Sequence, residues 1–236
     1  MTENVADVGR RLSRQEISDA VGGLGWRYVL GAVRASVPVA SLAQAADVAA
    51  RAVAAAGDDG DGSLWMDVRR DRVVLTLQSL AAARVTPLEI ELARRISGAV
   101  GELGLRTDAE VGGQGARSVQ LLEIAIDALD IAAVRPFWKA VMGYGDEAGA
   151  SGAEDPLVDP VGQGPAIWFQ QMDAPRPQRN RIHFDVSVPH DEAPHRIEAA
   201  LAAGGVLLSD AAAPSFWVLA DAEGNEACVT TWQGRD

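Results

Sequence analysis

Two ten-residue segments, far apart in the chain, carry the side chains best suited to chemistry. Residues 121–130 read LLEIAIDALD, and residues 181–190 read RIHFDVSVPH. Apolar and polar side chains alternate in both, which is typical of a strand with one buried face and one polar face. Glu123 and His183 occupy the same place in the two segments. A carboxylate and an imidazole that point from equivalent strands into one space could bind a metal or transfer a proton.

Two later segments, 166–172 and 226–232, also alternate and are predicted to be strands. Each places polar side chains and a tryptophan on a single face. These residues are Trp168, Gln170, Glu226, Cys228 and Trp232. Asp185 lies two residues after His183 and therefore on the same polar face of the predicted strand. We expect the ligand contacts to come from Trp168, Gln170, Trp232 and Asp185, because binding pockets combine apolar walls with a few polar groups.

The segments between these strands repeat as well. Helix-like stretches at 132–142 and 192–203 each end at glycine, which tolerates the left-handed backbone of a helix stop. The turns DPVG, at 159–162, and DAEG, at 221–224, pair an aspartate with a glycine. Each copy is therefore predicted to be one strand, one helix and about three further strands. Two such sheets, with their apolar faces under helices, would leave a cup between their polar faces.

This βαβββ repeat resembles the vicinal oxygen chelate superfamily, which includes glyoxalase I, extradiol dioxygenases, epimerases and bleomycin-resistance proteins. The phrases NRIHFDVSVP, at 180–189, and ADAEGNEACV, at 220–229, resemble its glyoxalase-like branch. The resemblance covers about residues 117–233. It implies the paired βαβββ glyoxalase/bleomycin-resistance fold, with metal ligands on the first and last strand of each module. Carried over by position, those places hold Glu123, Gln170, His183 and Cys228.

Cys228 departs from the resembled family, whose catalytic members usually have a carboxylate there, and Glu226 on the same strand face is the substitute candidate. The resemblance implies a divalent metal (zinc, iron, manganese or nickel) that acts as a Lewis acid on two neighbouring substrate oxygens. Glu123 or Glu226 would be the catalytic base, if burial raises its pKa. The alternative is a metal-free cup, in which Glu123 and His183 form a hydrogen bond and Cys228 is a small buried apolar residue.

Composition limits the classes of protein that fit. The chain has 236 residues, which suits two domains, and a net charge of −12, which argues against nucleic acid as a partner. Residues 111–236 contain 8 basic and 18 acidic residues, a net charge of −10. The polar N-terminus and the absence of a long apolar run predict neither a secretory leader nor a membrane span. One cysteine fits a reducing cytoplasm, and the excess of arginine over lysine, with many alanines, hints at a bacterial source.

The first domain, residues 1–106, shows clear helix starts. Three capping boxes pair a hydroxyl with a glutamate or glutamine three residues later. They are Ser13 with Glu16, Ser41 with Gln44, and Thr86 with Glu89. Strand-like runs lie at 26–30, 32–37, 64–68 and 73–77. The predicted order is αββαββα in an α+β chain, followed by a Gly-rich linker at 107–116 and the second domain at 117–236.

That order, with LSRQEI near the start and RVVLTLQS and VTPLEIELARRIS near the end, resembles pterin-4a-carbinolamine dehydratase. The family's activity depends on a His-His-Pro motif and a further histidine. Gly62, Ser63 and Ser79 stand near those places here, and no histidine precedes His183. Dehydration near neutral pH needs a group that titrates there. We therefore expect an inactive dehydratase domain, although Asp58, Asp59 and Asp61 could substitute.

The sequence thus favours a glyoxalase-like small-molecule protein with its ligand in the cup between the modules. It would be either a binding protein or an enzyme, such as a lyase, isomerase or dioxygenase. One alternative is 4a-hydroxytetrahydrobiopterin dehydratase activity of the first domain. The other is a metal-free protein that sequesters a ligand or drug. Both resembled families often self-associate, which suggests a homodimer.

Overall fold

The computed structural model describes residues 11–111, 117–119, 121–150, 152–175, 182–188, 190–231 and 233–234. The chain divides into two compact units, Met1–Leu121 and Leu122–Asp236. The division lies a few residues beyond the predicted linker at 107–116. The first residues of the predicted linker belong to the first unit because they form hydrogen bonds with it. Thr107 Oγ1 donates to the Leu24 carbonyl at 2.6 Å, and Asp108 exchanges two backbone hydrogen bonds with Ser36. Residues 112–116 of the predicted linker lie outside the described part.

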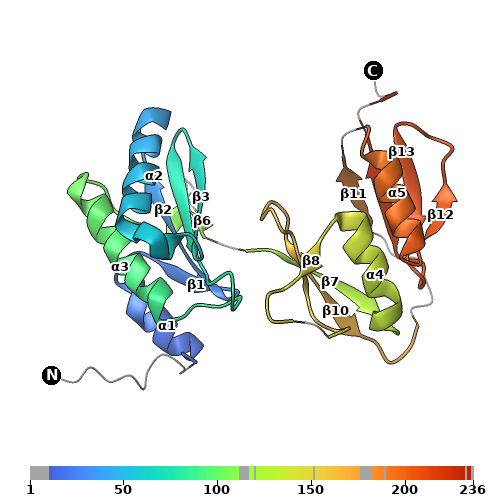
Figure 1. Ribbon diagram of the computed structural model, residues 1–236, viewed down its shortest axis with the longest axis horizontal. Helices are drawn as coiled ribbons and strands as arrows, with labels where there is room; N and C mark the ends of the chain where they lie inside the picture. Colours follow the sequence, from blue (N-terminus) through green and yellow to red (C-terminus); the bar gives the residue numbers. More distant parts are fainter. Residues whose placement is uncertain are drawn as a thin grey trace. The chain divides into compact units, whose positions relative to one another are not determined.

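The first unit has the predicted order αββαββα (Figure 1). Its antiparallel sheet has the strand order β1-β2-β4-β3. Its core lies between the helices and one face of the sheet, where valines of β2 and β4 are buried against α2 and α3. The elements are α1 (Arg14–Gly22), β1 (Arg27–Val29), β2 (Ala32–Pro38), α2 (Leu42–Ala56), η2 (Gly57–Gly60), β3 (Leu64–Arg69), β4 (Arg72–Leu77), α3 (Pro87–Glu102), β5 (Glu110–Val111) and β6 (Arg117–Ser118).

The three helices of the first unit begin at the predicted caps. Complete capping boxes start at Ser13 and Thr86. Ser41 also caps its helix, since its Oγ accepts from the Gln44 backbone N–H at 3.2 Å. The Gln44 side chain accepts from the N–H of Ala40 at 2.7 Å, one residue before the expected donor. Each cap satisfies a backbone donor that the helix itself leaves without an acceptor.

The second unit contains two βαβββ modules, as predicted. The strand orders are β7-β10-β9-β8 and β11-β14-β13-β12, and in each module the first strand runs parallel to the last. The first module comprises β7 (Glu123–Ala128), α4 (Ile131–Met142), β8 (Gly145–Asp146), β9 (Leu157–Val158) and β10 (Ala166–Gln171). The second comprises β11 (Phe184–Ser187), α5 (Ala193–Ala202), β12 (Val206–Ser209), β13 (Phe216–Ala220) and β14 (Glu226–Thr230).

The two modules share one hydrophobic core, in which α4 packs beside α5 (Figure 1). Trp138 of α4 is buried and meets the ring of Phe184 from the other module edge to face, with ring centroids 5.7 Å apart. Its indole N–H donates to Asp221 Oδ2 at 2.9 Å. Gly205 lies so close to the ring of Phe137 that a Cβ there would clash with it. Neither module buries its apolar face without the other.

Both predicted aspartate turns form. Asp159 accepts hydrogen bonds from three backbone N–H groups, at 2.7 to 3.0 Å. Burial tends to raise the pKa of Asp159, but these three donors outweigh it and lower the pKa. Asp221 accepts from two backbone N–H groups in the same way, at 2.9 and 2.8 Å. Gly162 and Gly224 take the positive φ values, +68° and +86°, that the turns require.

The predicted alternation of buried and exposed side chains also holds in the first strand of each module, except near the residues that precede the strand. Ile126 is buried, whereas Glu123 on the opposite face is exposed. The alternation assigns Leu122 and Ile182 to the buried faces of these segments, but the two side chains are 65% and 76% exposed. They precede the first residues that pair in β7 and β11, so they lie beyond the part of each sheet that the helices cover.

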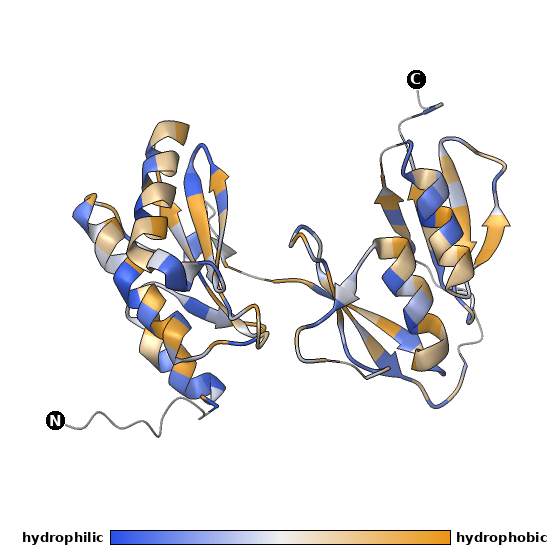
Figure 2. Ribbon diagram, viewed as in Figure 1, coloured by the Kyte–Doolittle hydropathy of each residue, from blue (hydrophilic) through white to orange (hydrophobic). Residues whose placement is uncertain are grey.

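The edge strand β12 is exposed along its whole length, and its residues are apolar except for Ser209 (Figure 2). Val206, Leu207 and Leu208 are 53%, 39% and 52% exposed. The register of its pairing with β13 shifts between Leu207 and Ser209. Within the described residues, the helices are too short or too polar to cross a membrane.

Candidate functional site

Three side chains that can bind a metal meet on the polar face of the second module's sheet. The His183 imidazole, the Asp185 carboxylate and the Cys228 thiol each offer a ligand atom, and these atoms lie within 4.8 Å of one another. The β-sheet register explains the meeting. Asp185 and Cys228 are direct partners in the parallel pair β11 and β14, so their side chains leave the same face. His183 lies two residues before Asp185, and its Nε2 is 3.5 Å from Asp185 Oδ1.

The three donors differ in exposure. Cys228 is 7% exposed and forms the floor of the site. The side chains of His183 and Asp185 are 49% and 60% exposed and form its rim. Thiolate, imidazole and carboxylate are together suited to borderline ions such as Zn²⁺ or Fe²⁺. Three protein donors would leave a fourth coordination position for a ligand, as in catalytic rather than structural zinc sites.

The other predicted site residues lie elsewhere on the two sheets. Glu123, the first residue of β7, does not join the donor cluster among the described residues. Trp168 and Gln170 share its sheet face, since they pair with Ala125 and Asp127 of β7. The Gln170 amide donates to the Gln171 carbonyl at 3.2 Å. The structure thus brings His183, Asp185 and Cys228 together and places Glu123, Trp168 and Gln170 on the sheet of the first module.

Two candidates remain on the strand that carries Cys228. Glu226 is half-buried and, two residues before Cys228, shares its face of β14. Trp232 lies outside the described residues. Asp185 was expected to contact a ligand rather than a metal. The signal that it could be a metal donor was its two-residue spacing from His183, which puts both side chains on one strand face.

The charge of Glu123 affects an acidic side chain in the loop after β8. Burial raises the pKa of Glu147 in that loop, and the negative charges of Asp155 and Glu123 raise it further. This acidic group lies in the first module, whereas the donor cluster lies in the second.

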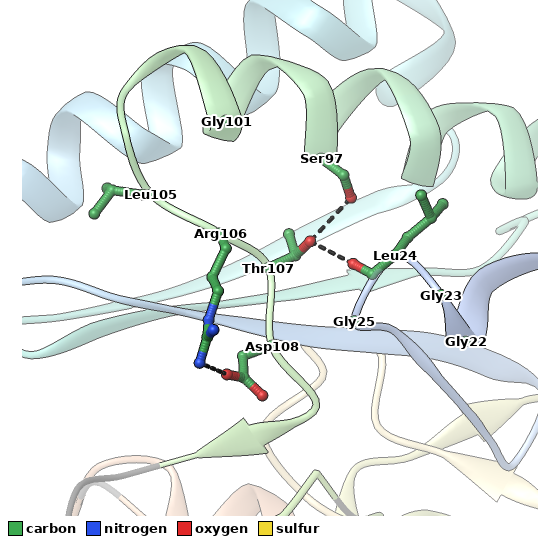
Figure 3. Close-up of a pocket in the computed structure, with 10 residues that line it drawn as sticks. All are labelled: Gly22, Gly23, Leu24, Gly25, Ser97, Gly101, Leu105, Arg106, Thr107 and Asp108. Carbon is green, nitrogen blue, oxygen red and sulfur yellow. Dashed lines mark hydrogen bonds and ion pairs between the residues drawn. The ribbon is translucent and has the colours of Figure 1, made fainter.

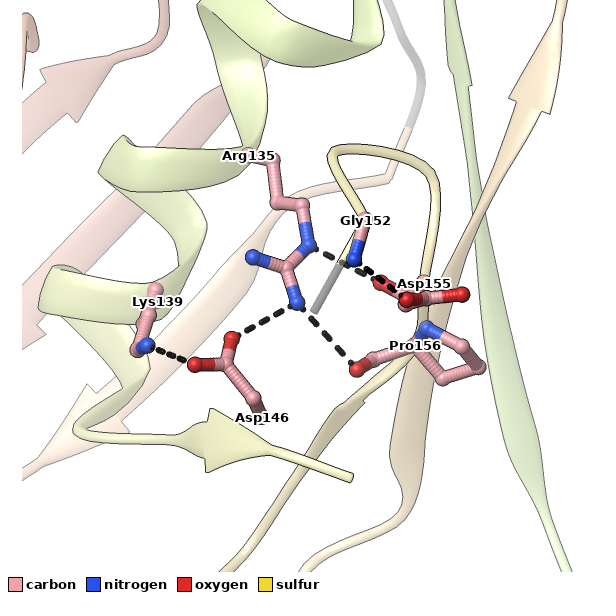
Figure 4. A network of polar contacts seen from close by, with 6 residues as sticks. All are labelled: Arg135, Lys139, Asp146, Gly152, Asp155 and Pro156. Atoms are coloured by element: carbon pink, nitrogen blue, oxygen red, sulfur yellow. Dashed lines mark hydrogen bonds and ion pairs between the residues drawn. The ribbon is translucent and has the colours of Figure 1, made fainter. Parts of the chain in front are cut away.

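A polar network ties the loop after β8 to helix α4 (Figure 4). Arg135, whose side chain is 12% exposed, donates from Nε to the Asp155 carbonyl and from Nη2 to Asp146, both at 2.8 Å. Lys139 donates to the other oxygen of Asp146 at 2.6 Å. These hydrogen bonds, from Lys139 first and then Arg135, hold the pKa of Asp146 below its usual value. The loop is therefore anchored at both ends.

We expect Arg135→Ala to raise amide hydrogen exchange in the loop 147–156 by about tenfold or more, because it removes contacts to two backbone carbonyls and to Asp146. Lys139→Ala is the matched control, since it removes one bond to Asp146 and none to the loop backbone. Equal exchange in the two variants would contradict the anchoring role.

The lowered pKa of Asp146 also predicts how the network responds to pH. A carboxylate whose pKa is lower in the folded protein stabilises the fold at pH values above its ordinary pKa, and this stabilisation is lost as the pH falls through the lowered pKa. The network should therefore persist at neutral pH and fail only in acid.

The first unit brings together the places where the resembled dehydratases have histidines. Ser63 is buried and donates to Glu89 Oε1 at 2.5 Å. The carbonyl of Gly62 accepts from the Leu80 N–H at 2.8 Å, beside Ser79. Glu89 is fully buried and also accepts from Thr86. These polar groups bond to one another, and they include no imidazole.

A pocket of about 580 Å³ lies elsewhere in this unit, at the ends of α1 and α3 (Figure 3). A hydrogen-bond chain runs through its wall from the Trp26 indole to Ser97, then to Thr107, and ends at the Leu24 carbonyl. The hydroxyl groups of Ser97 and Thr107 therefore both find hydrogen-bond partners within the protein. Gly62, Ser63 and Ser79 do not line this pocket, so it lies apart from the places that the resemblance gives to the family's histidines.

Residues 123–230 match a family profile described as "Glyoxalase-like domain". A search of curated proteins found no match. A glyoxalase/bleomycin resistance protein/dioxygenase family enzyme from Burkholderia phytofirmans PsJN is 18% identical, over 46% of this chain and 95% of that one, with a TM-score of 0.39. The fosfomycin resistance protein FosX from Listeria monocytogenes is 13% identical, over 47% and 89%, with a TM-score of 0.37. A transcriptional coactivator/pterin dehydratase from Brucella melitensis is 27% identical, over 38% and 98%, with a TM-score of 0.35.

Proposed function

We propose that the glyoxalase-like domain formed by residues 123–230 binds a small molecule at a divalent metal held by His183, Asp185 and Cys228. The observation that supports this is the approach of three different donor atoms to within 4.8 Å on one face of the sheet. A metal bound there supplies a Lewis acid that polarises oxygens of the ligand.

The donor set also limits which ion fits. A thiolate favours zinc or iron over manganese, which prefers oxygen ligands. The buried Cys228 thiol must lose its proton to bind, so metal uptake should weaken as the pH falls. Glu226, on the same face of β14, is the carboxylate best placed to accept a proton from a bound ligand. This assignment favours a proton-transfer reaction, as in a lyase or isomerase, over simple sequestration.

Metal analysis tests the proposal. We expect protein purified without chelator to carry about one zinc or iron per chain. The EDTA-treated protein should take up one equivalent of Co²⁺ and show a thiolate-to-cobalt charge-transfer band. Protein that holds no metal and gives no such band would contradict the site and favour the metal-free, ligand-sequestering alternative.

The resemblance also leads us to propose a cytoplasmic homodimer. Sedimentation equilibrium of the full chain measures the assembly state directly. A monomer at micromolar concentration would contradict the proposed dimer but would not bear on the proposed metal site.

A further inference from the structure

The pocket of the first unit is bounded largely by glycine backbone rather than by bulky side chains (Figure 3). Its glycines are Gly22, Gly23, Gly25 and Gly101. Among the described residues, a Cβ built at Gly22, Gly23 or Gly101 has no neighbour within 4 Å beyond its own helix backbone, so the space beside them is open. The volume of about 580 Å³ is ordinary for a small-molecule site. The pocket can therefore accept a small ligand.

The hydroxyl groups in the pocket wall can only accept hydrogen bonds from a ligand. Thr107 donates its hydroxyl proton to the Leu24 carbonyl, so Ser97 is the donor in the hydrogen bond between the two hydroxyls. The Ser97 oxygen also accepts from the indole N–H of Trp26 at 2.8 Å. Each hydroxyl oxygen thus retains one lone pair, and its proton is already used. A ligand that bonds to these oxygens must supply the donors.

The electrostatic surroundings of the pocket favour a positive charge. The pocket lies at the carboxyl ends of α1 and α3, where the helix dipoles are negative, and neither helix has a basic residue in its last turn. Asp108 adds a carboxylate, which accepts from Arg106 at 3.1 Å. The Arg106 side chain is 83% exposed, and Arg27, which is not a lining residue, donates to the Gly22 carbonyl. These two arginines offset part of the negative potential, but the wall itself still offers mainly acceptors.

We propose that this pocket binds a small aliphatic primary amine in its ammonium form. An ammonium group has three donors and no acceptor, which matches a wall of hydroxyl and carboxylate oxygens. Its donors bond to Ser97, Thr107 and Asp108. Its hydrocarbon stem lies on the partly buried side chains of Leu24 and Leu105, which also line the pocket. The site belongs to the first unit and does not depend on the proposed metal site.

Butylammonium, butanol and butyrate test the preference for charge, because they have similar stems and differ in their polar heads. We expect butylammonium to shift the backbone amide signals of Gly22, Gly101 and Thr107 saturably in NMR spectra of the isotope-labelled, full-length protein, with a Kd of about 1 mM. Butanol should bind about tenfold more weakly, because it has one donor and no charge. Butyrate should cause no saturable shift, because its carboxylate has no donor.

Two leucine substitutions on α3 test the location of the site. Gly101→Leu places a side chain in the pocket and should weaken butylammonium binding by more than about tenfold. Gly98→Leu is the matched control, since Gly98 also has open space beside it but lines a separate groove between α2 and α3. Both variants should melt at or above the wild-type temperature, because glycine is a poor helix former, so loss of binding in Gly101→Leu would not reflect unfolding. Asp108→Asn should reduce the preference for butylammonium over butanol to about threefold, because it removes the charge and keeps an acceptor.

The contrary results overturn the proposal. If butyrate binds as tightly as butylammonium, the guanidinium of Arg106 rather than the acceptors determines which ligand the pocket takes. If Gly101→Leu keeps the wild-type affinity for butylammonium, the amine binds elsewhere on the protein. If none of the three probes causes a saturable shift, the pocket binds no ligand of this class.

Discussion

Cys228→Ser should lower the cobalt affinity of the protein by more than about 100-fold and abolish the thiolate-to-cobalt charge-transfer band. The thiol is the buried member of the three donors, and the hydroxyl of serine is a far weaker ligand. Removing even an indirect partner of a metal ligand costs about 10- to 100-fold in affinity, so removing the ligand itself should cost more. A competition titration against a chelator of known affinity measures the change.

Three further variants make that result specific. His183→Ala should weaken cobalt binding by a similar factor but keep the charge-transfer band, because Cys228 remains. His195→Ala is the matched control, since His195 is an exposed histidine of α5 outside the donor cluster. Glu123→Gln should have no effect on cobalt affinity. If it weakens binding as much as His183→Ala does, the ligand set carried over from the family resemblance is the correct one. If His183→Ala loses the folded state, His183 has a structural role rather than a metal-binding one.

The fold of this chain could be predicted because its signals are local. A hydroxyl three residues before a glutamate specifies a helix start at Ser13 and Thr86, whatever the rest of the chain does. Strict alternation specifies which residues of β7 face the core, and an aspartate followed by a glycine specifies the turns at Asp159 and Asp221. The ends of strands are less local, because exposure at Leu122 and Ile182 depends on how far the helices extend over the sheet.

The grouping of site residues could not be predicted in the same way. Equivalent positions in two repeats, such as Glu123 and His183, lie on the same strand face of their own modules, but this equivalence does not fix the distance between them. Their distance depends on how the modules pack, and that packing is set by long-range contacts such as the hydrogen bond from Trp138 to Asp221. The pairing of Asp185 with Cys228, by contrast, follows from the parallel β11 and β14 register. It could have been inferred once the βαβββ order was recognised.

Trp138→Ala should lower the free energy of unfolding of the second unit by about 3–5 kcal/mol, the usual cost of deleting a large buried aromatic side chain. Trp138 is 1% exposed, packs edge to face on Phe137 and Phe184, and donates to Asp221. Because Phe184 and Asp221 belong to the second module, the loss should reach both halves of the shared core. Hydrogen exchange of β14 amides in the full-length protein measures the local stability, and urea unfolding followed by circular dichroism gives an independent value.

The conservative variant separates the two contributions of this side chain. Trp138→Phe retains an aromatic ring in the core but removes the indole N–H, so we expect it to cost about 1–3 kcal/mol, the range for leaving a buried acceptor short of one donor. Trp65→Ala is the matched control, since Trp65 of β3 is 38% exposed and belongs to the first unit. It should leave β14 exchange unchanged. If Trp138→Ala accelerates exchange in β7 and β10 but spares β14, each module folds on its own. The second unit would then be two independent sheets rather than one duplicated domain with a common core.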